Sequence, residues 1–85
     1  MRESAVKIDV KDHSQAGMLE SMTFEGVKLE KRGDLTFYLK FDREQRSNAE
    51  VIRDVLNRVD VRDIAIEEQS IEDVVKRIYS GESIE

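Results

Sequence analysis

Residues 27–41 read Val-Lys-Leu-Glu-Lys-Arg-Gly-Asp-Leu-Thr-Phe-Tyr-Leu-Lys-Phe, and this segment carries the clearest strand pattern in the chain. Apolar and polar side chains alternate along its second half, as expected for a strand with one buried face; the apolar positions are Leu35, Phe37, Leu39 and Phe41. Lys31, Arg32, Gly33 and Asp34 supply turn chemistry between the halves, and Gly33 can adopt a positive φ. We therefore predict a β-hairpin over residues 27–41, preceded by Gly26 at a bulge or at the start of the strand.

Two further strands are indicated on either side of the hairpin. Within residues 5–11, three apolar side chains alternate with charged ones: Val6, Ile8 and Val10. Close to residue 65, the same period of two places Ile64 and Ile66 on one face. A period of two with one charged face is typical of half-buried strands.

A helix is predicted to begin after Ser47. Ser47 and Glu50 have the spacing of a capping box, and apolar residues then recur at helical spacing: Val51, Ile52, Val55, Leu56 and Val59. Asp54 lies four residues before Arg58, which suits a surface ion pair on this helix.

A shorter helix is expected over residues 14–22. Ala16, Leu19 and Met22 step by three and can share one helical face, with Ser14 as the N-cap. Gly17 weakens this helix by about 1 kcal/mol relative to alanine.

The last helix is predicted from residue 70 onward. Ser70 and Asp73 open it with a capping pattern, and an apolar stripe follows: Ile71, Val74, Val75, Ile78 and Tyr79. Glu72 and Asp73 lie in its first turn, where carboxylates favour the helix dipole.

The order of these elements indicates an α+β fold. The first six match the ferredoxin-like split βαβ plan, βαββαβ, with an antiparallel sheet, helices on one face and an extra C-terminal helix. We expect one small domain over residues 1–85, with an ordered core of about residues 5–81 and a tail at 82–85.

Composition excludes several classes of protein. The 85 residues include no cysteine, so a disulfide framework, a thiolate nucleophile and a zinc ribbon are excluded. The net charge of −5 argues against nucleic-acid binding. With no long apolar run and no secretory signal at the start, we expect a cytoplasmic protein that does not insert into a membrane.

No motif points to catalytic, cofactor-binding or metal-binding residues. His13 is the one histidine and is expected in a solvated loop. The acidic residues do not have EF-hand spacing, and the four glycines form no phosphate-binding motif. Arg32-Gly33-Asp34 is interpreted as turn chemistry rather than as an adhesion motif.

The polar face of the hairpin is the candidate interaction face. Thr36, Tyr38 and Lys40 alternate with the apolar residues of the second hairpin strand. A tyrosine has an apolar ring with a polar tip, which is common at protein interfaces. A solvated face of mixed charge is the alternative interpretation.

Residues 64–75, Ile-Ala-Ile-Glu-Glu-Gln-Ser-Ile-Glu-Asp-Val-Val, resemble the close of the C-terminal extension in ATP-binding subunits of ABC-type exporters. Extensions of the ABC-2 or drug- and antibiotic-export class commonly finish with a short strand and a Glu-Pro-Ser-Leu-Glu-Asp-Val-Phe-like helix start. The motif residues that correspond are Glu68, Ser70, Ile71, Glu72, Asp73 and Val74, with isoleucine in place of the leucine. Gln69 and Val75 replace the proline and the phenylalanine of that pattern.

This resemblance implies a noncatalytic accessory or regulatory domain. ATP and magnesium would bind upstream in the parent subunit, and Met1 would be an artificial start. The implied partners are the nucleotide-binding domain, a second copy and, indirectly, a membrane permease. Two alternatives remain open at this point: a free-standing ferredoxin-like regulatory or small-ligand-binding module, and a small enzyme built around carboxylates or Tyr38.

Overall fold

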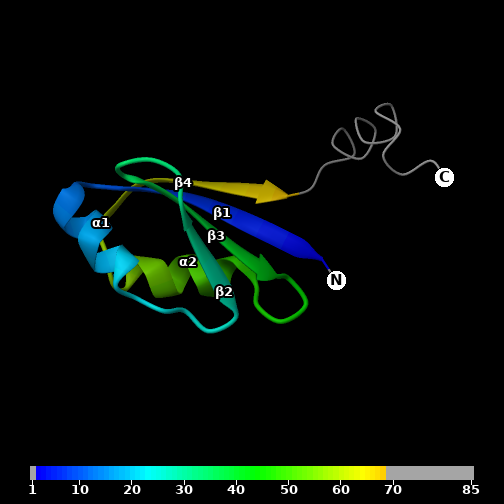
Figure 1. Ribbon diagram of the computed structural model, residues 1–85. Coiled ribbons are helices and arrows are strands. Elements are labelled where there is room, and N and C mark those ends of the chain that lie inside the picture. The colour runs from blue at the N-terminus through cyan, green and yellow to red at the C-terminus, as the bar shows by residue number, and fades with distance from the viewer. Residues whose placement is uncertain (1, 69–85) are drawn as a thin grey trace, which may run out of the picture.

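The computed structural model describes residues 2–68 and shows a four-stranded antiparallel sheet with two helices (Figure 1). The elements, in chain order, are β1 (Glu3–Val10), α1 (His13–Glu20), β2 (Val27–Lys31), β3 (Thr36–Asp42), α2 (Asn48–Leu56) and β4 (Val61–Glu68). The sheet order is β2-β3-β1-β4, so β2 and β4 are the edge strands. The α+β class and the predicted order of these elements are confirmed. The helix predicted from Ser70 and the tail at 82–85 lie outside the described residues.

Both helices lie on the same side of the sheet (Figure 1). The alternation predicted for β1 and β3 is confirmed, because the apolar residues of both strands are buried on that side: Val6, Ile8, Val10, Phe37, Leu39 and Phe41. The register places Val6 opposite Leu39 and Ile8 opposite Phe37. We call this side of the sheet the core face and the side away from α1 and α2 the open face.

Helix α2 begins as the sequence predicts. The Ser47 hydroxyl accepts a hydrogen bond from the Glu50 amide, and the Glu50 carboxylate accepts one from the Ser47 amide, both at 3.1 Å. Val51 and Val55 are fully buried against the sheet. Leu56 belongs to the predicted apolar face but is 51% exposed. It is offset from Val55 by about 100° around the helix, toward the outer flank.

Helix α1 starts two residues earlier than a cap at Ser14 predicts, because its N-cap is Asp12. Asp12 has extended backbone angles, and its carboxylate accepts a hydrogen bond from the Gln15 amide at 3.0 Å. Ser14 therefore lies inside the first turn. Ala16 and Leu19 are buried as expected.

Of the two glycines near the hairpin, Gly26 and not Gly33 has a positive φ. Gly33 does not need a positive φ, because the connection runs over four residues and the amides of Arg32 and Gly33 both donate to the Thr36 carbonyl, at 2.9 and 3.2 Å. Gly26 instead has a φ of 72° in the turn just before β2, where a left-handed conformation favours glycine.

Candidate functional site

The open face carries the three residues that the sequence singles out for interaction. Thr36, Tyr38 and Lys40 alternate on β3 with the buried residues of the core face, and each is partly exposed. Tyr38 lies at the centre, since the register places it between Lys7 of β1 and Glu30 of β2. The open face therefore combines one aromatic ring with charges of both signs.

Contacts across three strands hold Tyr38 in place. Its hydroxyl donates a hydrogen bond to the Glu67 carboxylate of β4 at 3.2 Å. The guanidinium of Arg32 lies 4.5 Å from the centre of its ring, within the range of a cation–π contact. The phenol is therefore oriented by partners that the sequence does not place next to it.

Ion pairs and hydrogen bonds also fix the neighbours of Tyr38. Lys40 contacts Glu30 at 3.0 Å, and Arg32 contacts the other oxygen of the same carboxylate at 3.1 Å. Hydrogen bonds from Lys40 and Arg32 lower the pKa of Glu30. The Thr36 hydroxyl donates to the Asp9 carboxylate at 2.7 Å. The two ion pairs of Glu30 are partly exposed, so a partner could exchange them at modest cost.

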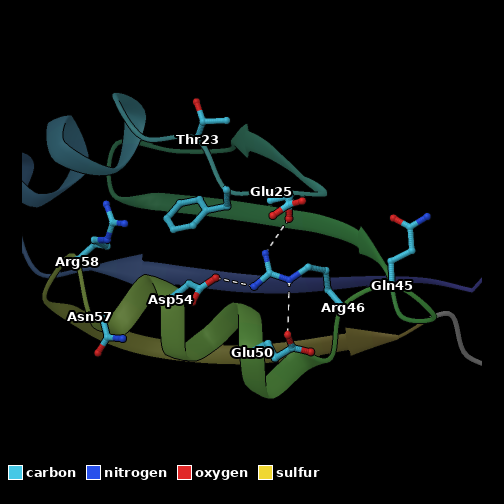
Figure 2. Close-up of a pocket in the computed structure, with 9 residues that line it drawn as sticks. Thr23, Glu25, Gln45, Arg46, Glu50, Asp54, Asn57 and Arg58 are labelled. Atoms are coloured by element: carbon cyan, nitrogen blue, oxygen red, sulfur yellow. Dashed lines mark hydrogen bonds and ion pairs between the residues drawn. The ribbon is translucent and has the colours of Figure 1, made fainter.

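A polar groove lies on the core-face side, along the flank of α2 (Figure 2). It is lined by α2, by the segment before β2 around Phe24 and by the loop before α2. Arg46 crosses this groove and contacts the Asp54 carboxylate at 2.5 Å and the Glu25 carbonyl at 2.7 Å. The Glu50 carboxylate lies 4.0 Å from it.

Arg46 acts as a structural clamp in this groove. The hydrogen bond that Arg46 donates to Asp54 raises the pKa of Arg46, and hydrogen bonds with the Ser47 backbone and hydroxyl lower the pKa of Glu50. Asp54 pairs with Arg46 rather than with Arg58, the partner expected from helical spacing. Because the guanidinium is already engaged, an anionic ligand would have to displace a carboxylate before it could bind there.

The remaining residues considered from sequence lie apart from these surfaces. His13 is exposed, but at the first position of α1 rather than in a loop. Arg32, Gly33 and Asp34 lie in the connection between β2 and β3, which is shifted by one residue from the predicted turn, since Lys31 ends β2 and Leu35 belongs to the connection. Among residues 2–68, no three histidine or carboxylate side chains are grouped to hold a metal ion. No helix in that part of the chain is long and apolar enough to cross a membrane.

The residues of the C-terminal motif fall mostly beyond the described part of the chain. Glu68 is the last residue of β4, and the residues that follow it in the motif, from Ser70 to Val74, lie outside the described residues. Comparisons of the chain with protein-family models, curated proteins and solved structures found no match.

Sequence reasoning alone misses two features of the site. The Arg46 clamp joins elements that are distant in the chain, and its only local signal is an arginine just before the Ser47 cap. The partner of Tyr38 depends on the pairing of β4 with β1, which follows from the sheet order and not from residue spacing.

Proposed function

We propose that the chain is a noncatalytic accessory domain of the ATP-binding subunit of an ABC-type exporter of the ABC-2 or drug- and antibiotic-export class. One observation carries the proposal. Strand β4 ends at Glu68, where the motif that resembles those extensions continues with Ser70. A short strand leading into this motif is the arrangement that the resemblance implies. On this proposal the domain works at the cytoplasmic side of a membrane-bound complex.

The open face is the surface proposed to contact the nucleotide-binding domain of the parent subunit or a second copy. Tyr38 offers an amphipathic ring held by Arg32 and Glu67, and a tyrosine beside an arginine is a composition enriched at interfaces. ATP and magnesium belong to the upstream domain in this proposal, and no residue of this chain is assigned to them.

The fold underlying this proposal is the ferredoxin-like split βαβ arrangement. The strand order β2-β3-β1-β4, with all neighbours antiparallel and both helices on one face, is compatible with it. That arrangement supports many functions, so it does not by itself identify one.

The decisive experiment is to read the parent gene upstream of the Met1 codon. The proposal expects an open reading frame that continues in the N-terminal direction into a Gly-x-x-x-x-Gly-Lys-Ser/Thr loop and an ABC signature loop. A ribosome-binding site and an in-frame stop codon directly upstream of Met1 would refute it.

A free-standing regulatory or small-ligand-binding module is the second candidate function. A ligand of such a module would be expected at residues 12–18 and 60–63, which belong mostly to α1 and to the start of β4 rather than to loops. The Gln15 side chain accepts a hydrogen bond from the Asp60 amide at 2.7 Å, and the Asp60 carbonyl accepts one from the Lys11 amide at 3.1 Å.

A small-molecule screen by two-dimensional NMR tests this second candidate. Saturable shifts confined to residues 12–18 and 60–63 would favour a ligand-binding module. Shifts spread over the open face with an added nucleotide-binding domain would favour the accessory domain.

A further inference from the structure

The two edges of the sheet differ in length and in charge. Strand β2 has five residues and carries Lys28 and Lys31, and lysine on an edge strand discourages pairing with another chain. Strand β4 has eight residues, and its central triplet, residues 64–66, is uncharged. Within residues 2–68, no strand pairs with the outer side of β4.

Two hydrogen bonds at the end of β1 show which of its backbone groups face β3 and which face β4. The Val10 amide donates to the Leu35 carbonyl at 2.9 Å, on the side of β3. The next amide, that of Lys11, donates to the Asp60 carbonyl at 3.1 Å, on the side of β4. In an antiparallel sheet these directions alternate, so the odd-numbered residues of β1 bond toward β4.

The same alternation leaves the backbone of Ile64 and Ile66 facing outward. Ala65 is paired with Lys7, an odd-numbered residue, so its amide and carbonyl face β1. The Ile64 amide agrees with this assignment, because it donates to the Asp63 carboxylate at 3.0 Å instead of to β1. The Ile66 amide and the carbonyls of Ile64 and Ile66 therefore face away from β1, and no strand within residues 2–68 pairs with them.

Side chains of β4 differ between the two faces of the sheet. Ile66 lies on the core face, opposite the fully buried Val6, yet it is 51% exposed. On the open face, the exposed residues Asp63 and Glu67 flank Ala65. A strand added at this edge would cover Ile66 on one face and meet two carboxylates on the other.

We propose that the outer edge of β4 binds an extended segment of another protein as a fifth strand, with apolar side chains on the core face and lysine or arginine on the open face. The basic side chains of such a segment would lie beside the exposed carboxylates of Asp63 and Glu67, which is why we expect a basic partner. In antiparallel pairing about Ala65, a second copy would place Ile64 opposite Ile66 but also Asp63 opposite Glu67, two like charges, so this register disfavours self-pairing. The inference goes beyond the proposed function and does not depend on an exporter as parent.

The test is an NMR titration of the full 85-residue chain with the capped peptide acetyl-Lys-Val-Arg-Val-Lys-Thr-amide. We expect saturable shifts centred on the Ile66 amide and slower hydrogen exchange of that amide in the complex. A Glu-Val-Glu-Val-Glu-Thr peptide should bind far more weakly. The basic peptide methylated on the nitrogens of both valines should also fail, because those amides are the ones that would face β4.

Two double variants test whether binding depends on the negative charges of β4 or only on the net charge of the protein. Asp63→Asn combined with Glu67→Gln should weaken binding of the basic peptide about fivefold, the effect of losing two exposed ion pairs. Glu25→Gln combined with Asp34→Asn removes the same two negative charges elsewhere on the surface and should leave the affinity unchanged. Melting curves of both variants show whether they remain folded.

Three outcomes would overturn the proposal. The first is no shift at Ile66, or shifts confined to the open face or the groove. The second is an Ile66 amide already protected in the free protein at every protein concentration, which would assign the edge to residues 69–85 of the chain itself. The third is protection that rises with protein concentration, which would assign the edge to a second copy.

Discussion

Phe37 and Tyr38 are neighbours on β3, and replacing each by alanine tests whether the sheet has one covered face. Phe37 is fully buried on the core face, whereas Tyr38 is partly exposed on the open face. The two substitutions remove aromatic rings of similar size from adjacent positions of the same strand. The difference between their effects on the free energy of unfolding should therefore reflect how deeply each ring is buried on its own face of the sheet.

The structure gives the expected size of each effect. Truncating a fully buried phenylalanine to alanine costs roughly 3–5 kcal/mol. Tyr38 loses one exposed hydrogen bond to Glu67 and one contact with Arg32, together about 1 kcal/mol, in addition to the smaller packing loss of a partly buried ring. At about 0.05–0.15 kcal/mol per residue, this 85-residue chain has a total stability of roughly 4–13 kcal/mol. Phe37→Ala therefore removes a large share of it.

Urea unfolding followed by far-UV circular dichroism measures both variants, since the chain has no tryptophan to report by fluorescence. In thermal melts, each kcal/mol should lower the midpoint by roughly 4–8 °C for a domain of this size. If Tyr38→Ala cost as much as Phe37→Ala, the open face would be covered too. The open face could then not serve as a free docking surface, and the assignment of its residues to a partner would be wrong.

Three further predictions concern local structure. Ser47→Ala should lower the free energy of unfolding by about 1 kcal/mol, measured in urea, because it removes the capping box of α2. The lowered pKa values of Glu30 and Glu50 stabilise the fold above the unfolded carboxyl value near 4.5, and this contribution is lost as pH falls through the folded values. Melting temperatures below about pH 5 should therefore fall less steeply in a Glu30→Gln, Glu50→Gln double variant. Gly26→Ala should destabilise by about 1–2 kcal/mol because of its positive φ, whereas Gly17→Ala should stabilise by up to about 1 kcal/mol, since nothing lies within 4 Å of the added methyl group; urea unfolding of the pair checks the sign of each.

Local signals in the sequence were sufficient to predict α2 and β3. The Ser47 capping box and the period-two alternation of β3 involve residues within a few positions of one another, and the structure has both. The N-cap of α1 was mispredicted because Asp12 and Ser14 are both good capping residues. Only the actual backbone path shows that the carboxylate of Asp12 reaches the Gln15 amide.

The exposure of Leu56 and Ile66 could not be predicted, because it depends on how far the helices extend over the sheet. Periodicity correctly places Ile66 on the core face, as its pairing with Val6 shows. It does not reveal that β4 is an edge strand, where α2 leaves Ile66 about half exposed. The Arg46 clamp was missed for a related reason, since its partner Glu25 comes from a distant loop.

The hydrogen bond between Tyr38 and Glu67 links the two proposed binding surfaces. Glu67 lies on β4, so its carboxylate contributes both to the open face and to the acidic side of the β4 edge. A basic strand at that edge would compete with the phenol for this carboxylate, whereas the backbone groups of Ile66 would be unaffected by the phenol. Loss of the Tyr38 hydroxyl should therefore weaken docking on the open face without weakening strand addition at β4. The two surfaces can be tested separately for that reason, even though one side chain belongs to both.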